Sequence, residues 1–258
     1  MCAFMAGFLA AVWLTLGCAP ALAAEVPNIA AAADLQFSLQ EIAALFARQT
    51  GKRVKLVFGS SGNFRRQIAE GAPFELFLSA DESFVQVLSK EGHTEGDGAL
   101  YAIGRIALFV PHGSPLVPDA QLRDLAQAIT DGRLKRFAIA NPEHAPYGRA
   151  AQEALIKAGL WDAIRPRLVL GESVAQAAQF ATSGSAQGGI IAYSFALSPA
   201  LAQSGTYALL PAEWHKPLRQ RMALVKNAGA TARAFYQFLQ QPEARAIFRQ
   251  NGFALPNE

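Results

Sequence analysis

The amino-acid sequence predicts an α/β protein in which β-strands alternate with helices along a chain of 258 residues. Short apolar runs, mostly of β-branched or aromatic residues, are bounded by Gly or Pro and are typical of buried strands. The segments between them place apolar residues three or four positions apart, which is the spacing of one helix face. Elements that alternate in this way form parallel or mixed sheets with helices on both faces, and no fixed-period repeat indicates a solenoid.

The strands are expected where the apolar runs occur, and the helices between them. One strand precedes Ala33, and the others are VKLVF (54–58), FELFL (74–78), RIALFV (105–110), RFAIA (136–140), RLVL (167–170), GGIIAY (188–193) and RMALV (221–225). The spacing of apolar residues predicts helices over residues 35–46, 122–129, 174–181, 231–239 and 242–249.

The first 24 residues contain no charged side chain and end in small residues, with Ala-Leu-Ala at positions 21–23. This pattern predicts a secretory signal peptide, cleaved near Ala23 or Ala24. An uncleaved membrane anchor and a lipid anchor on Cys18 remain open alternatives, because the apolar run is long and lacks a positive start. Both cysteines, Cys2 and Cys18, lie in this segment, so the mature chain is expected to have no disulfide, no cysteine-ligated metal and no thiol catalysis.

Charge and motifs indicate a binding protein rather than an enzyme. The formal net charge is +3, but no dense run of Lys and Arg forms the basic stripe of a nucleic-acid-binding protein. The four histidines lack the spacing of metal ligands, and the chain has no phosphate-binding loop, dinucleotide fingerprint or serine-hydrolase elbow. We therefore expect no catalytic residue, no metal site, no cofactor and no nucleic-acid partner.

Three turns that join a strand to a helix carry polar residues: Ala33-Asp34, FGSSGN (58–63) and Ser79-Ala80-Asp81. In open α/β sheets, ligands bind beyond the carboxyl ends of the strands, where such turns lie. The FGSSGN turn offers glycines, two hydroxyls and free N–H groups at a helix start, which suits an oxyanion. The alternative is that Ser61 only caps the helix that follows it.

The linked motifs resemble those of the periplasmic molybdate-binding proteins of ABC importers. These proteins show an alanine run, an FGSSG-like turn, RQIxxGAP and an L-F-x-SAD segment in the order found here over residues 31–81. NPEHAPYGRAAQEAL (141–155) resembles their NPEHxPxG segment, and AFYQFLQQPEARAIFRQNGF (234–253) resembles their C-terminal helices. The resemblance extends over essentially the whole mature chain.

The resemblance implies a type II periplasmic binding fold, with two α/β lobes that close on a ligand in the cleft between them. Residues 1–24 would be the signal peptide, 25–104 the first lobe and 105–221 the second lobe, with 222–258 returning to the first. RIALFV and RMALV would be the outgoing and returning crossings. The implied protein is an exported, monomeric periplasmic solute-binding protein that captures an oxyanion such as molybdate or tungstate and delivers it to an ABC permease.

The resemblance also implies a set of neutral hydrogen-bond donors. Ser61 would donate its hydroxyl and its N–H to the anion, with the hydroxyl of Ser60 beside it. The NPEHAPYG position falls on Tyr147, where relatives use the backbone N–H and sometimes a tyrosine, and Val174 matches a further backbone donor. Neutral donors allow tight but reversible binding of an anion.

A tyrosine that completes the pocket in some relatives aligns with Ala192, and Tyr193 follows it. Neighbouring residues on a strand point to opposite faces, so both positions are candidates and this last donor stays open.

Asp34 occupies the first ligand position, where the family has a serine. Two unit charges about 4 Å apart, at an effective dielectric of about 20, interact by about 4 kcal/mol, so a carboxylate here would repel a dianion. The carboxylate could accept a hydrogen bond from a protonated oxyanion such as hydrogen phosphate, contact a neutral or cationic solute, or bind a metal through oxygen. It could also turn away and cap its own helix. Each alternative predicts weakened molybdate binding or a changed ligand.

Two further functions remain as alternatives. The same fold could serve as a periplasmic sensor that reports a solute to a receptor. An enzyme on this scaffold would need acid–base groups in the cleft, and only Asp34, Asp81 and Glu172 are candidates.

Overall fold

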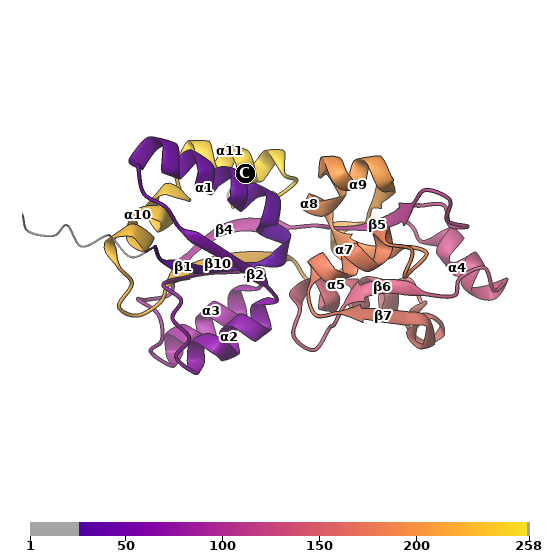
Figure 1. Ribbon diagram of the computed structural model, residues 1–258. Helices are drawn as coiled ribbons and strands as arrows, with labels where there is room; N and C mark the ends of the chain where they lie inside the picture. Colours follow the sequence, from indigo (N-terminus) through magenta and orange to yellow (C-terminus); the bar gives the residue numbers. More distant parts are fainter. Residues whose placement is uncertain (1–25, 257–258) are drawn as a thin grey trace, which may run out of the picture.

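Two five-stranded sheets, each at the centre of one lobe, lie side by side in the computed structural model, which describes residues 26–256 (Figure 1). The expected signal peptide, residues 1–24, lies outside the described residues. No helix within residues 26–256 combines the length and the apolar character needed to cross a membrane. The two α/β lobes implied by the resemblance are thus present.

The first lobe is built on a sheet of strand order β2-β1-β3-β10-β4. β1 runs parallel to β2 and β3, and β10 runs antiparallel to β3 and β4. Its elements are β1 (Asn28–Ala32), η1 (Ala33–Leu35), α1 (Gln36–Thr50), β2 (Lys55–Gly59), α2 (Ser61–Ala69), β3 (Leu76–Ser79), α3 (Glu82–Lys90), β4 (Ala99–Gly104), β10 (Leu218–Leu224), α10 (Ala230–Phe238) and α11 (Pro242–Gln250).

The second lobe repeats this plan, with strand order β7-β6-β8-β5-β9. β6 runs parallel to β7 and β8, and β5 runs antiparallel to β8 and β9. Its elements are β5 (Ile106–Pro111), α4 (Arg123–Thr130), β6 (Phe137–Ala140), α5 (Pro146–Lys157), α6 (Trp161–Ile164), η2 (Arg165–Arg167), β7 (Leu168–Gly171), α7 (Val174–Thr182), β8 (Gly189–Ala192), α8 (Tyr193–Ala196), α9 (Pro199–Ser204), β9 (Gly205–Leu209) and η3 (Ala212–Trp214).

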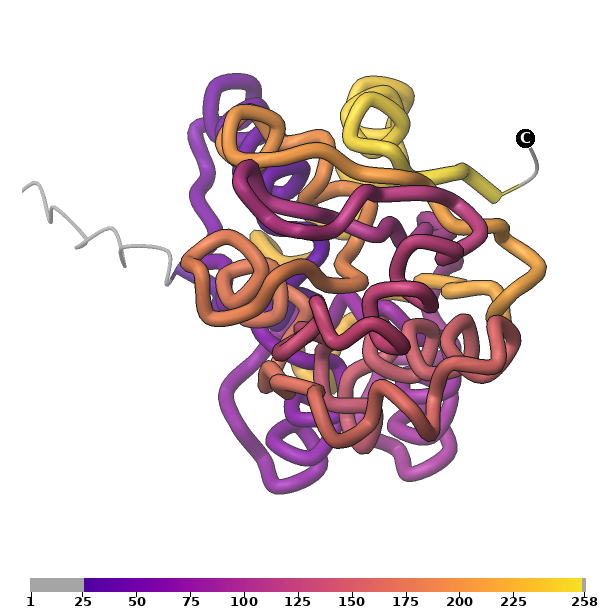
Figure 2. The backbone as a smooth tube through the Cα atoms, turned by 90° about the vertical axis from the view of Figure 1, so that its right-hand side faces the viewer, coloured from indigo at the N-terminus to yellow at the C-terminus, as the bar shows by residue number. Residues whose placement is uncertain are grey.

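Helices cover both faces of the first sheet, which explains why the strands β1 and β3 are buried at nearly every position. In Figure 1 α1 and α11 lie on one side of the sheet, and α2 and α3 lie on the other. In Figure 2 the yellow segment of α11 lies at the top of the molecule and the purple segment of α2 and α3 at the bottom. Successive strand residues point to opposite faces, so Ile29 and Ala31 join the larger core cluster, while Ala30 packs with Phe64 and Phe77. Packing on both faces of the sheet therefore holds each strand, and with it the turn that follows the strand, in position.

The chain crosses between the lobes twice. β4 ends at Gly104 in the first sheet, and β5 begins at Ile106 in the second, so the outgoing crossing is the single residue Arg105. The Arg105 guanidinium donates to the carbonyl of Leu210 (3.0 Å), which lies at the start of the returning segment. The two crossings are thereby tied to each other at the hinge.

The returning crossing differs from the sequence-based expectation. RMALV is not a crossing, because β10 already pairs with β4 from Leu218 onwards. The chain therefore passes back through residues 210–217 and rejoins the first sheet four residues before the expected boundary at 222.

Candidate ligand-binding site

A small cavity lies between the lobes, at the carboxyl ends of the central strands. It has an empty volume of about 190 Å3 and is lined by Ala32, Ala33, Asp34, Gly59, Ser60, Ser61, Ala80, Ala145, Pro146, Tyr147 and Val174. All three turns picked out in the sequence contribute to this lining. Seven of the lining residues belong to the first lobe and four to the second, so a solute in this space would touch both lobes.

Three helices begin at the cavity. Ser61 is the first residue of α2, Tyr147 is the second of α5, and Val174 is the first of α7. The first N–H groups of a helix have no partner within the helix, and the macrodipole makes this end positive. The cavity is therefore an environment that favours negative charge.

The side chain of Asp34 is buried in this cavity, with 1% of its surface exposed. Its Oδ2 accepts hydrogen bonds from the Tyr147 hydroxyl (2.9 Å) and from Gln220 Nε2 (2.6 Å). Its Oδ1 is buried and has no hydrogen-bond partner among the described residues. One carboxyl oxygen is therefore held by two donors, while the other is left unsatisfied.

Asp34 does not cap its own helix, contrary to one of the alternatives considered from the sequence. The residues at the cap positions of η1 and α1 are Ala32 and Leu35, and neither helix has a side-chain cap. The carboxyl is instead turned towards Tyr147 of the second lobe and Gln220 of β10. The hydrogen-bond donors of the Asp34 side chain therefore come from elements remote in the sequence and not from the start of its own helix.

Burial raises the pKa of Asp34 from its ordinary value of 3.8 to about 6, although the hydrogen bonds from Gln220, from Tyr147 and from its own backbone act in the opposite direction. The loss of hydration thus destabilises the carboxylate form more than its hydrogen bonds stabilise it. Burial, followed by the charge of Asp34, also raises the pKa of Tyr147 well above its usual range. Tyr147 therefore stays protonated and remains a donor.

Gln220 and Tyr101 extend this network, and neither residue was predicted from the sequence. The Tyr101 hydroxyl donates to Gln220 Oε1 (2.8 Å), which leaves the Gln220 amide nitrogen aimed at Asp34. Gln220 is fully buried between Arg219 and Arg221, whose side chains point to the other face of β10. A lone neutral amide at an inward strand position is the signal that could have identified it.

The lobes touch directly around the cavity. Gly62 N–H donates to the carbonyl of His144 (3.0 Å), and His144 Nδ1 lies 3.1 Å from Ser60 Oγ. A Cβ on Gly62 would lie 2.5 Å from the same His144 carbonyl, so only glycine permits this approach. The Ser194 hydroxyl also donates to the Asp34 carbonyl (2.8 Å). These contacts show the lobes in a closed arrangement.

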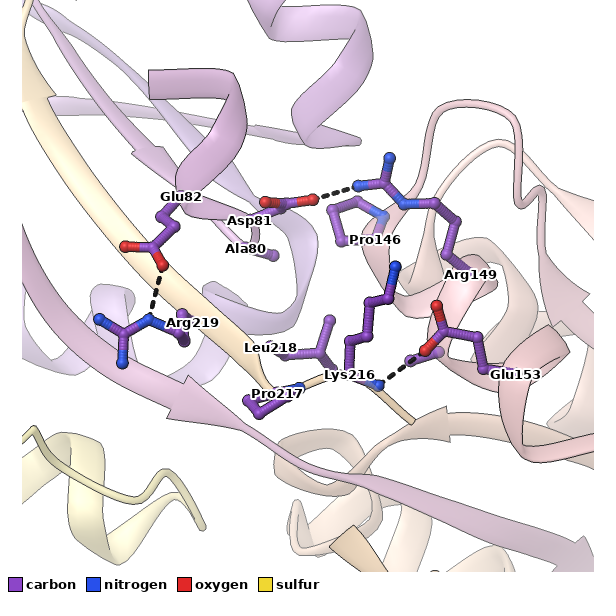
Figure 3. Close-up of a pocket in the computed structure, with 11 residues that line it drawn as sticks. Ala80, Asp81, Glu82, Pro146, Arg149, Glu153, Lys216, Pro217, Leu218 and Arg219 are labelled. Atoms are coloured by element: carbon purple, nitrogen blue, oxygen red, sulfur yellow. Dashed lines mark hydrogen bonds and ion pairs between the residues drawn. The ribbon is translucent and has the colours of Figure 1, made fainter. Parts of the chain in front are cut away.

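A second pocket lies next to the cavity and shares Ala80 and Pro146 with it (Figure 3). Across this pocket the guanidinium of Arg149 on α5 is paired with the carboxylate of Asp81, which caps α3 (Figure 3). Arg149 also lies over the Phe84 ring, 5.1 Å from its centre. This pair is a further bridge between the lobes.

The structure brings most of the predicted site residues together. Asp34, Ser60, Ser61, Tyr147 and Val174 all line the cavity. Ser61 does more than begin a helix, because its hydroxyl oxygen accepts the N–H of Ala80 (2.9 Å) while the residue faces the cavity.

Ala192 and Tyr193 do not line the cavity, which corrects their place among the candidates. Ala192 ends β8 and is fully buried opposite Ile106. Tyr193 is the first residue of α8, and its ring packs edge-on against Tyr207, with centroids 5.6 Å apart. The tyrosine that lines the cavity is Tyr147 of α5.

One alternative from the sequence was that Asp34 binds a metal through oxygen. Within residues 26–256, no group of three His, Cys, Asp or Glu side chains is placed to hold a metal ion.

Comparison with known proteins shows a consistent similarity over nearly the whole chain. A family model described as bacterial extracellular solute-binding protein matches residues 27–254. The molybdate-binding protein ModA of Rhodobacter capsulatus is 38% identical over 247 residues, covering 94% of each chain. ModA of Azotobacter vinelandii is 36% identical over 243 residues, covering 93% of each chain.

Among solved structures, the periplasmic molybdate-binding protein of Azotobacter vinelandii superposes with a TM-score of 0.82 at 31% identity. The match covers 90% of this chain and 100% of that one, so both lobes and their connections correspond.

Proposed function

Because the chain belongs to the bacterial extracellular solute-binding protein family, we propose that it captures a small tetrahedral oxyanion of the molybdate type for an ABC importer. Exported by residues 1–24, it would close its lobes on the anion in the periplasm and deliver it as a monomer to the permease. The expectation of a binding protein rather than an enzyme is confirmed by the family match.

The observation that carries this proposal is the convergence of three helix starts on a cavity of about 190 Å3 between the lobes. Positive helix ends and neutral donors bind an anion without a fixed counter-charge. Ser61, Tyr147 and Val174 would supply backbone N–H groups, and Ser60 and Ser61 would add hydroxyls. The names of the relatives in Rhodobacter and Azotobacter support molybdate as the first anion to test.

Calorimetric titration of the purified protein with molybdate, tungstate, sulfate and phosphate tests the proposal. We expect molybdate and tungstate to bind most tightly, and Ser61→Ala to weaken that binding by about 10–100-fold, since a hydrogen bond to a charged group contributes about 1.5–3 kcal/mol. Ser83→Ala, on the exposed side of α3, is the matched control and should leave the affinity unchanged. Failure of every oxyanion to bind between about pH 5 and pH 8 would overturn the proposal.

A further inference from the structure

The cavity between the lobes combines two features that conflict when an anion enters it. Three helix starts favour negative charge, yet Asp34 lines the same small space. Nine of the other ten lining residues carry no side chain that titrates, and the tenth, Tyr147, stays protonated. An ionised Asp34 beside a dianion would bring two negative groups together without a positive side chain between them.

The unsatisfied oxygen of Asp34 shows how this conflict is resolved. Oδ2 is already occupied by the Tyr147 and Gln220 donors, so Oδ1 is the atom left for a ligand. Two oxygens that face each other across a short contact attract only when a proton lies between them. A carboxylic acid at Asp34 would donate that proton, and the unpartnered oxygen would gain its missing hydrogen bond.

We propose that this cavity binds its anion together with one proton, which is shared between Asp34 Oδ1 and an anion oxygen. The inference rests on the proposed function and adds a condition to it. A fully ionised anion such as molybdate takes up one proton from solution on binding and releases it on dissociation. An anion that already carries a proton, such as hydrogen phosphate, supplies the proton itself.

The surroundings of Asp34 favour the neutral acid. The groups that face its carboxyl from other elements are uncharged at neutral pH: Tyr147 from α5, Tyr101 from β4 and Gln220 from β10. From α8, Ser194 contacts only its main chain. Burial accordingly raises the pKa of Asp34 to about 6, within reach of neutral pH.

The ionisable groups of the remaining neighbours lie away from the carboxyl. α7 contains no ionisable residue, and the tyrosine of α8, Tyr193, packs on Tyr207. Arg65 of α2 pairs with Glu91 on the outside of the lobe. His144 touches the cavity only through Ser60, and its other ring nitrogen lies 3.3 Å from Glu172. The described residues thus place no positive side chain against Asp34 that would keep it ionised.

Affinity should therefore depend on pH in a defined way. The fraction of the protein with a protonated Asp34 falls about tenfold with each pH unit above its pKa. The apparent affinity for the anion falls in proportion to this fraction. Molybdate affinity is expected to fall about tenfold between pH 7 and pH 8. Asp34→Asn should bind with almost no pH dependence, because its amide keeps an acceptor for Tyr147 and Gln220 and presents a permanent donor in place of Oδ1.

Calorimetric titration with sodium molybdate, repeated at one pH in buffers of different ionisation enthalpy, counts the protons bound with each anion. At about pH 7.5 we expect close to one proton per molybdate for the natural protein and close to none for Asp34→Asn. Towards about pH 5 the uptake should vanish and the two affinities should converge. The proton count of the natural protein decides the question even if the variant does not fold.

The outcomes separate this inference from the function on which it rests. Molybdate binding with no proton uptake, or with an affinity that is constant from about pH 5 to pH 8, overturns the proton-linked site and leaves the proposed function intact. No binding of molybdate, tungstate, sulfate or phosphate by the natural protein between about pH 5 and pH 8, nor by Asp34→Asn, overturns both.

Discussion

Replacing Asp34 by Asn should stabilise the ligand-free protein at neutral pH, although the substitution is made in a buried hydrogen-bond network. The carboxylate is destabilising because it is desolvated, whereas the amide is neutral at every pH. The Asn oxygen can still accept the hydrogen bonds that Tyr147 and Gln220 give to Oδ2. Little is lost by the exchange, and the cost of a buried charge is removed.

The magnitude follows from the pKa of Asp34. The change from 3.8 in the unfolded chain to about 6 in the folded protein, at about 1.4 kcal/mol for each pH unit, gives about 3 kcal/mol. A carboxyl whose folded pKa is raised stabilises the fold below its unfolded pKa and loses that contribution as pH rises through the folded value. The difference between variant and natural protein should therefore be near zero at about pH 4 and reach its full size above about pH 7.

This value is a ceiling, because opening of the lobes would hydrate the carboxylate and relieve part of the cost. Urea unfolding of both proteins without ligand, measured from acid to neutral pH, gives the difference directly. Asp162→Asn is the matched control, since Asp162 is exposed on α6 and its removal should give no such pH-dependent gain. If Asp34→Asn were less stable than the natural protein at about pH 8, or if the difference did not grow with pH, the account of a strained buried carboxylate would be wrong.

Three further substitutions test the closed site. Gly62→Ala places a methyl group 2.5 Å from the His144 carbonyl, so the molybdate affinity measured by calorimetry should fall by at least about tenfold, and an unchanged affinity would contradict the closed geometry. Unfolding experiments should show the helix unchanged or more stable by about 0.5–1 kcal/mol. Tyr147→Phe removes a hydrogen bond that lowers the pKa of Asp34, so the pH at which affinity begins to fall should move upwards, and a downward shift would refute this assignment. Arg149→Ala removes a partly exposed interlobe ion pair and should weaken molybdate binding by no more than about fivefold; a much larger loss would assign Arg149 a direct role in binding. The affinity of the variant should depend less on salt concentration than that of the natural protein.

The elements with clear periodicity were predictable, whereas strands at some sheet edges were not. The apolar runs correctly indicated β2, β3, β5, β6, β7, β8 and β10 to within a few residues. ALYAIG (99–104) and GTYAL (205–209) were missed, and they form the outer strands β4 and β9. Only Arg105 separates β4 from β5, so the apolar run of β4 merges with the next one. Tyr207 on β9 is 38% exposed, as expected of an edge strand that partly faces solvent.

The polar turns of the site were likewise visible, because each follows a strand at its carboxyl end. The hydrogen bonds that join these turns to the rest of the site could not be predicted from the sequence. Asp34 and Tyr147 are 113 residues apart, and Asp34 and Gln220 are 186 apart, so no local pattern relates them. Asp34 was identified as the unusual position, but its partners depend on how two lobes meet, and chain spacing does not encode that.

Asp34 belongs to the first lobe, yet the second lobe holds it at two points, its carbonyl through Ser194 and its carboxyl through Tyr147. Separation of the lobes must break both contacts and let water reach the carboxyl. Water favours ionisation, so the acid would give up its proton in the step that frees the anion. A permease that pulls the lobes apart would then receive the anion while the proton returns to the surrounding fluid. At neutral pH the loss of this proton would leave Asp34 ionised and would oppose rebinding of the anion.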